Sequence, residues 1–421
     1  MRRTHQLPAV LLAAGLAASV LTAPVQAAGE TRADPAVIVG WNTIASRTIF
    51  TENATPIPAS PLYYGFVSLA VYDAVVAIEG GYEPYLRQPR VHGPASSEAA
   101  AATAAYEVLR FYFPASASNL ATDHAASLDA VPDGRAKATG IAVGRHAAEK
   151  LIRARHNDGR GAAIAFTRAP RTGVWRPTPD ALAPMAVPWL GFVRPLALHS
   201  PTQLRLPGPD PVRSKAYARD FAEAKAMGSA TGSKRTAAQT QTALFWNANA
   251  VLQYQVTLGQ ELGARGWNLV RTARAFALLG MGTADSLIAC WRAKYDYGYW
   301  RPITAIRLAG EDGNRATRPD PAWTSLIPAP PYPEYPSGHA CVTGAATETF
   351  GHLFGRRSID VEVFSSVTGT SRQFRTAAAL DAETQDARIW LGIHFRRAMT
   401  DGNELGHRAA AWTIAHELRR R

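Results

Sequence analysis

The stretch SPLYYGFVSLAVYDAVVAIEGG, residues 60–81, decides the fold class of this 421-residue chain. Ser60 belongs to the residue types that cap helix N-termini, and Pro61 suits a first helical turn, where a proline loses no hydrogen bond. The sequence from Leu62 to Ile78 is apolar almost throughout, and Gly80-Gly81 is typical of a helix end. We therefore predict a buried helix here, with Ser60 as its N-cap.

Similar signals recur along the chain, so the predicted fold class is all-α. Ser97 to Phe113 is rich in alanine and ends at Pro114. Further helices are predicted over 133–155, 213–228, 235–262, 266–297, 337–353, 376–393 and 399–419. Ile359 to Phe364 is the best candidate for a strand. We expect a multi-helix bundle with few or no strands.

Composition excludes several classes of protein. Apolar residues make up 47% of the chain and charged residues 19%, which excludes a disordered protein. Two cysteines exclude a disulfide scaffold. The net charge of +12 comes from 45 Lys and Arg against 33 Asp and Glu. The basic residues form no run of three before Arg419-Arg420-Arg421, so we expect no nucleic-acid partner.

Residues 1–27 have the pattern of an export signal. Arg2-Arg3 precede an apolar run from Leu7 to Leu21, and Val25-Gln26-Ala27 fits the small-x-small cleavage pattern. The run is shorter than the roughly 20 residues that a membrane-spanning helix needs. We expect cleavage after Ala27 and an exported chain, secreted or periplasmic, without a stable membrane span. The general and the twin-arginine export routes both stay open.

Residues 157–210 separate two predicted parts of the chain. This segment holds nine prolines and shows little periodicity, which is typical of a long irregular connection. We predict an N-terminal helical part over 28–210, which includes this segment, and a catalytic helical domain over 211–421. The oligomeric state is left open.

Three motifs in the second part carry unusual polar residues. Lys294 and Arg301 are seven residues apart, which places two cations on one helix face among Tyr and Trp residues. Taken alone, they could form a solvated basic face. If they are buried, they need an anion, because unpaired buried cations are costly.

The second motif is Pro336-Ser337-Gly338-His339, and the third runs from Arg388 to His394. A hydroxyl cap followed by glycine begins a helix whose free N–H groups can bind an anion, and His339 could exchange a proton with it. Taken alone, these motifs also fit an ordinary capped helix and a core histidine. Together they supply three cations, a hydroxyl, helix N–H groups and two imidazoles, a set suited to a tetrahedral oxyanion.

This combination resembles the signature of the superfamily that joins vanadium-dependent haloperoxidases with type 2 phosphatidic acid phosphatases and bacterial acid phosphatases. The stretches Tyr299 to Ile303, Pro333 to His339 and Gly392 to Arg396 are similar to its exported, haloperoxidase-like bacterial branch. The motifs span 294–394, and a looser likeness covers about 40–421. The fold that this resemblance implies is helical, with the anion site in the C-terminal half.

The resemblance also implies a role for each residue of the motifs. His394 would be the vanadium ligand, or the nucleophile that forms phosphohistidine in a phosphatase. His339 would be the acid or base, and Lys294 would also polarise bound peroxide. The residues implied to hold vanadate or phosphate are Lys294, Arg301, Ser337, Gly338, Arg388 and His394. The implied reaction is oxidation of halide by hydrogen peroxide at histidine-bound vanadate.

Two departures from the family pattern leave parts of the site open. Ala398 stands where the family often has an aspartate that orients the ligand histidine, so we consider Asp401, Asp285 and Asp386 as replacements. Tyr332 stands where related enzymes have Phe or His, so the halide preference stays open. The pairing of Cys290 with Cys341 is also left open.

Two alternatives remain at this point. An exported acid phosphatase acting on phosphate monoesters would use every motif residue and need no cofactor, because vanadate mimics phosphate. A catalytically silent anion-binding helical protein would show neither activity. The mature length and the Gly-Ile-His-Phe-Arg stretch at 392–396 favour the haloperoxidase-like enzyme.

Overall fold

The computed structural model describes residues 33–179 and 181–421. The predicted signal segment 1–27 lies outside them, so cleavage and export stay predictions. Residues 33–421 form one compact unit, in which helices before and after residue 210 pack on each other. These contacts do not test the predicted boundary at residue 210, which stays a prediction.

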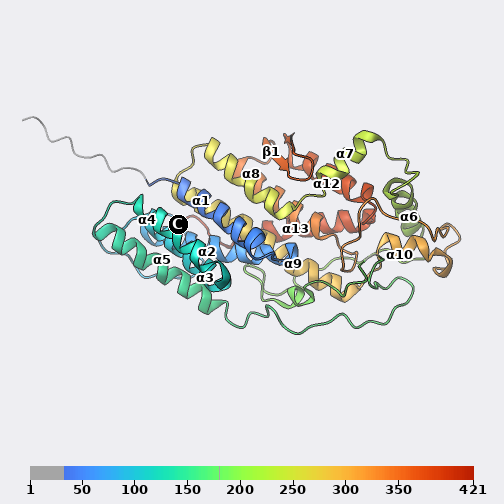
Figure 1. Ribbon diagram of the computed structural model, residues 1–421, viewed down its shortest axis with the longest axis horizontal. Coiled ribbons are helices and arrows are strands. Elements are labelled where there is room, and N and C mark those ends of the chain that lie inside the picture. The colour runs from blue at the N-terminus through green and yellow to red at the C-terminus, as the bar shows by residue number, and fades with distance from the viewer. Residues whose placement is uncertain (1–32, 180) are drawn as a thin grey trace, which may run out of the picture. The chain divides into compact units, whose positions relative to one another are not determined.

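The described residues are mostly helical, which confirms the predicted all-α class (Figure 1). The first five α-helices are α1 (Ala36–Ser46), α2 (Ser60–Glu79), α3 (Ser97–Tyr112), α4 (Ala117–Asp129) and α5 (Arg135–Ala154). The later ones are α6 (Lys215–Gly228), α7 (Ala237–Phe245), α8 (Ala250–Ala264), α9 (Leu269–Tyr297), α10 (Pro302–Arg307), α11 (Gly338–Phe354), α12 (Ala377–Trp390) and α13 (Arg396–His416). The short helical turns are η1 (Arg47–Glu52), η2 (Ile57–Ala59), η3 (Pro114–Ser116), η4 (Pro188–Phe192) and η5 (Ala309–Glu311).

The predicted strand is present, but it has a partner that we did not predict. β1 (Val361–Ser365) pairs with β2 (Thr370–Phe374) in an antiparallel hairpin, with Val361 opposite Phe374. Alternate residues of β1 are buried, whereas β2 is mostly exposed. The exposed strand lacks the apolar alternation that would have revealed it.

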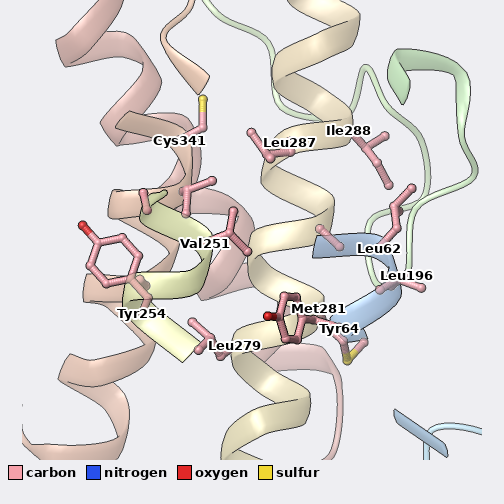
Figure 2. Close-up of a cluster of buried hydrophobic side chains, with 14 of the residues drawn as sticks. Leu62, Tyr64, Leu196, Val251, Tyr254, Leu279, Met281, Leu287, Ile288 and Cys341 are labelled. Carbon is pink, nitrogen blue, oxygen red and sulfur yellow. The ribbon is translucent and has the colours of Figure 1, made fainter. Parts of the chain in front are cut away.

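The core is built around α9, which α2, α8, α11 and α13 contact. Its residues from Ala275 to Trp291 are buried without interruption. Figure 2 shows this core where Val251 and Tyr254 of α8, Leu279 and Leu287 of α9 and residues of α2 come together. Because α9 is surrounded on all sides, its sequence is apolar all round.

Two of these helices, Ile57–Glu79 and Leu269–Tyr297, are long and apolar enough to span a membrane. Within the protein, 83% and 94% of their most apolar windows are buried against other elements. Their composition is therefore accounted for by their central place in the core.

Two predicted helix boundaries were wrong. Ser60 lies inside α2, and its hydroxyl donates to the carbonyl of Ile57 while Ala59 is the N-cap. The helix predicted over 235–262 is two helices, because the Asn249 side chain accepts the N–H groups of Val251 and Leu252 and so begins α8 anew.

The irregular segment 157–210 is held against α9 by a buried carboxylate. Asp285 accepts backbone N–H groups from Leu196, Ala197 and Leu198 at 2.6–2.7 Å. Burial raises the pKa of Asp285 to about 6, and the three N–H groups act in the opposite direction. Asp285 thus anchors a loop and is not available to orient Arg388 or His394.

A histidine between two carboxylates joins α11, α12 and α13. His407 of α13 contacts Asp381 of α12 at 2.9 Å and Glu348 of α11 at 3.2 Å. Burial lowers the pKa of His407, but both carboxylates outweigh burial and raise it to about 9.

Charged His407 should stabilise the folded protein below its ordinary pKa of 6.5 and lose this effect as the pH rises through about 9. We expect His407→Gln to lower the free energy of unfolding by about 2–3 kcal/mol at pH 6. The loss should shrink toward zero at pH 10. Urea unfolding of both proteins across this range measures it, and a loss that does not change with pH would contradict the assignment.

Candidate functional site

Lys294 lies near the end of α9 and is fully buried. Its ammonium donates to the carbonyls of Pro333, Glu334 and Pro336 at 2.7, 3.1 and 2.5 Å. Burial lowers the pKa of Lys294 to about 8. An ammonium has three protons, and all three are donated to carbonyls of the loop before α11. Lys294 can therefore attract an anion through its charge but has no further proton to donate to it.

Arg301 caps α10 and is also fully buried. Its Nε donates to the Tyr332 carbonyl at 2.9 Å and its Nη1 to the Ile393 carbonyl at 2.8 Å, while Nη2 has no protein partner. Burial lowers the pKa of Arg301. The guanidinium thereby joins the loop at 332 to the segment before His394 and keeps one donor free.

Ser337 and Gly338 begin α11, as predicted. The Ser337 hydroxyl accepts the N–H of Ala340 at 3.3 Å, which leaves its own proton free to donate. The backbone N–H of Ser337 donates to the Ala398 carbonyl at 3.0 Å and so joins α11 to α13. The first N–H groups of a helix have no partners within it, and the first two residues of α11, Gly338 and His339, line the pocket described below.

Gly338 is required for close packing. A Cβ atom at this position would lie 2.9 Å from the Trp291 ring. We expect Gly338→Ala to lower the free energy of unfolding by about 1–3 kcal/mol, because the buried indole must move. Gly351→Ala in the same helix is the matched control, since no atom lies within 4 Å of its Cβ and we expect a gain of up to about 1 kcal/mol. Equal changes in thermal unfolding would contradict this view of Gly338.

Arg388 lies in the last turn of α12 and is 7% exposed. Its Nη1 donates to the Trp246 carbonyl at 3.0 Å, in the break between α7 and α8, and its Nε has no protein partner. Burial, together with the nearby charge of Arg301, lowers the pKa of Arg388 to about 10. The Nε–H of this buried guanidinium is therefore available to a bound anion.

His394 is held by a residue that the motif analysis did not single out, Glu334. The His394 Nδ1 lies 2.9 Å from Glu334 Oε1, which also accepts the backbone N–H of Phe395 at 3.0 Å. Both side chains are buried. Burial raises the pKa of Glu334, and the Phe395 N–H together with the charges of Arg301 and Lys294 opposes that rise.

The contacts around His394 select one tautomer of its ring. Arg301 Nη1 lies 3.3 Å from Nε2, and a guanidinium can only donate, so Nε2 carries the lone pair and Nδ1 the proton. Burial lowers the pKa of His394 well below its ordinary value, and the charge of Arg301 acts in the same direction. A neutral imidazole whose Nε2 carries the lone pair, here accepting from Arg301, is the form that a ligand or nucleophile requires.

His339 completes the group from the first turn of α11. It is partly buried, its Nε2 has no protein partner, and its ring stands edge-on to Trp246 at a centroid distance of 6.3 Å. Burial and the charge of Arg388 lower the pKa of His339 well below its ordinary value. It can therefore accept a proton as a neutral base.

The predicted residues converge on one pocket of about 490 Å³. Gly338, His339, Arg388 and His394 line it. Lys294 and Arg301 lie beneath Tyr332, whose ring centre is 5.0 Å from Nζ and 4.9 Å from the guanidinium carbon. The charges of Lys294 and Arg301 act on one buried carboxylate, that of Glu334, and Arg388 is a third buried cation. At least two positive charges therefore lack a carboxylate partner among the described residues.

This arrangement fits a tetrahedral oxyanion such as vanadate or phosphate. The unused nitrogens of Arg301, Arg388 and His339 are buried polar groups of the kind that a bound anion would satisfy. Vanadate would be held by the same residues, with the Nε2 of His394 as its ligand. We find no cluster of three His, Cys, Asp or Glu residues suited to a metal cation in the described part of the chain.

The three aspartates that we considered for orienting His394 have other hydrogen-bond or ion-pair partners. Asp401 accepts from the Tyr335 hydroxyl at 2.5 Å and from Arg397 at 2.8 Å, and Asp386 pairs with Arg396 at 2.6 Å. Those predictions were wrong because the orienting carboxylate comes from another element. The signal that could have found Glu334 is an acidic residue within an apolar, proline-rich stretch three positions before Ser337.

Cys290 and Cys341 are both buried and form no disulfide. The Cys290 thiol lies 3.7 Å from the carbonyl of Pro336, directly before the α11 N-terminus. The two cysteines thus serve as small core residues beneath the pocket.

The fold and the pocket define a helical protein with a pocket beside three buried cations. Residues 274–420 match the model of the family described as the VCPO second helical-bundle domain, which confirms the resemblance drawn from the motifs. Part of the chain is 28% identical to the vanadium chloroperoxidase of Curvularia inaequalis. That match covers 30% of this chain and 27% of the relative, so the chain spans about a quarter of that protein.

Two solved structures share the fold over most of the chain. A bacterial vanadium-dependent iodoperoxidase superposes with a TM-score of 0.79 at 20% identity, covering 91% of this chain and 97% of the other. A holo-type bacterial vanadium-dependent chloroperoxidase has a TM-score of 0.70 at 18% identity with the same coverages. At these identities the likeness shows the fold, and the activity has to be argued from the site.

Proposed function

We propose that this protein is a vanadate-dependent haloperoxidase that oxidises halide with hydrogen peroxide. The observation that carries the proposal is the pairing of an unprotonated His394 Nε2 with at least two uncompensated buried cations in one pocket. The fold of the bacterial haloperoxidases supports it. Bound vanadate supplies a Lewis-acidic centre that activates peroxide without a change in its own oxidation state.

Each residue of the site would then have a distinct role. Glu334 orients the imidazole of His394 and strengthens its basicity. Arg301 and Arg388 balance the anion's charge, and the Ser337 hydroxyl and the α11 N-terminus donate hydrogen bonds to it. His339, whose Nε2 has no protein partner and which lines the pocket, would take up and return a proton. Lys294 adds charge and holds the loop that carries Glu334.

Hydrogen peroxide and halide are the proposed small-molecule substrates. We also propose export of the mature chain to a compartment outside the cytoplasm, which the sequence pattern of residues 1–27 supports. N-terminal sequencing of the secreted protein tests this, and a new N-terminus at residue 28 is the expected result.

The deciding experiment assays two reactions with one protein. With orthovanadate, hydrogen peroxide and iodide or bromide, we expect halide oxidation that is lost in His394→Ala, because no ligand nitrogen remains. In parallel, a chromogenic phosphate monoester is tested without vanadate. Ester cleavage that depends on His394, without halide oxidation, would establish the acid phosphatase instead, and absence of both would establish a silent anion-binding protein.

A further inference from the structure

The hydroxyl of Tyr332 is a polar group of the pocket that makes no hydrogen bond of normal geometry to the described residues. The hydrogen bonds of Tyr332 are made by its backbone. Its carbonyl accepts the Nε–H of Arg301 at 2.9 Å, and its N–H donates to the Pro330 carbonyl at 2.8 Å. Its side chain lines the same pocket as His339 and His394. The phenol therefore reaches the anion groups with its proton available.

We propose that the Tyr332 hydroxyl donates a hydrogen bond to the oxyanion bound beside His394, which makes Tyr332 a further catalytic residue of this site. Its contact with bound phosphate or vanadate stands on the pocket alone, whereas its part in halide oxidation rests on the proposed function. The three motifs supply guanidinium, imidazole, serine hydroxyl and backbone donors. A phenol adds a donor of a kind that the motifs do not contain.

The phenol oxygen lies near both guanidiniums that have unpartnered nitrogens. Burial lowers the pKa of Arg301 and the pKa of Arg388, and in each case the strongest opposing influence is that of the Tyr332 phenol. Electrostatic influence falls with distance, so a group that acts on both side chains lies close to both. The hydroxyl is thus a neighbour of the two side chains whose unpartnered donors, Nη2 of Arg301 and Nε of Arg388, a bound anion would use.

The charges around the phenol decide which part of it an anion can use. A guanidinium can only donate, so Arg301 and Arg388 attract the lone pairs of the phenol oxygen and repel its proton. The proton of a hydroxyl rotates about the C–O bond to suit its surroundings. A bound oxyanion would supply an acceptor for it, and hydrogen bonds to an ionised acceptor are roughly twice as strong as neutral ones.

The ring that carries this hydroxyl is held in place. Its centre lies 5.0 Å from Lys294 Nζ and 4.9 Å from the guanidinium carbon of Arg301. The Trp291 ring stands at a centroid distance of 4.9 Å with an interplanar angle of 55°. Cation–π and aromatic contacts therefore add to the two backbone hydrogen bonds. A donor on a fixed ring loses little conformational freedom when the anion binds.

The alternative is that Tyr332 serves only as a cover for the cations of Lys294 and Arg301. A phenylalanine would cover them equally well, because a cation–π contact uses the face of the ring and not the hydroxyl. The two explanations therefore predict different results when the hydroxyl alone is removed and when the whole ring is removed.

The test measures binding of inorganic phosphate to the protein without vanadate, by isothermal titration calorimetry. We expect Tyr332→Phe to raise the phosphate dissociation constant about 10- to 100-fold, the usual contribution of a hydrogen bond to a charged group. Tyr332→Leu, which removes the ring as well, should raise it at least as much. Tyr112→Phe is the matched control. It also removes an unpartnered hydroxyl, but from a residue of α3 outside this pocket, and it should bind phosphate as wild type does.

Near-ultraviolet circular dichroism checks that each variant keeps its tertiary structure. Phosphate affinity that Tyr332→Phe leaves unchanged would overturn the proposal, and a loss confined to Tyr332→Leu would show that the ring is only a cover. Wild-type protein that binds neither phosphate nor vanadate would overturn it as well.

Triiodide formation from iodide, with orthovanadate and hydrogen peroxide, judges the proposed function separately. If phosphate affinity depends on the Tyr332 hydroxyl but the wild-type protein forms no triiodide, this inference stands and the proposed function fails. If triiodide forms and phosphate affinity does not depend on that hydroxyl, this inference alone fails.

Discussion

Glu334→Gln should lower halide oxidation by about 10- to 100-fold, the usual effect of changing a residue that orients a metal-ligating histidine. The amide can still accept a hydrogen bond from His394 Nδ1, so the ring keeps its place but loses the adjacent negative charge. Glu334→Ala should have a larger effect. It leaves two buried N–H groups without an acceptor, those of His394 and Phe395, at a cost of about 1–3 kcal/mol each.

The measurement combines orthovanadate titration, rate and unfolding free energy for each variant. A positioning role predicts that Glu334→Gln weakens vanadate binding and shifts the pH profile of the rate while changing stability little. Glu362→Gln on the exposed hairpin is the matched control and should resemble wild type. If Glu334→Gln retains full vanadate affinity and rate, Glu334 serves folding alone.

Arg388→Met should have opposite effects on stability and on anion binding. Without a bound anion, Arg388 is a buried cation with one backbone hydrogen bond and no carboxylate partner, so an apolar side chain of similar length should stabilise the protein by about 1–4 kcal/mol. The same change removes a charge and a free donor from the oxyanion site. We expect phosphate and vanadate affinity to fall by about 30- to 1,000-fold, as when one partner of a buried charge pair is lost.

Thermal unfolding with and without phosphate tests both effects in one experiment. In wild type, phosphate at 1,000 times its dissociation constant should stabilise the protein by about 4 kcal/mol, and in Arg388→Met the same phosphate concentration should stabilise it by only about 0.4–2 kcal/mol. Arg153→Met, which removes an exposed and weakly paired arginine, is the control and should stay within about 0.5 kcal/mol of wild type. A destabilised Arg388→Met that responds to phosphate as wild type does would show that Arg388 acts only in packing.

Local sequence signals were sufficient for most helices and for the three motifs. The helices at α2, α3, α5, α9, α11, α12 and α13 agree with their predicted ranges within a few residues, because apolar periodicity, caps and prolines act over short distances. The short α1, α4 and α10 and the second hairpin strand were missed. Their exposed or brief patterns carry little periodic signal.

The sequence by itself determined that the chain is helical and that Lys294, Arg301, Ser337, Gly338, His339, Arg388 and His394 belong together, since residue type and order carry that information. Only the tertiary structure decided which carboxylate orients His394, which carbonyls accept the hydrogen bonds of the Lys294 ammonium and how large the pocket is. Glu334 lies 60 residues from His394, and the broken helix at 246–249 reaches Arg388 across 142 residues. Such contacts depend on how whole helices pack, and no local pattern records that packing.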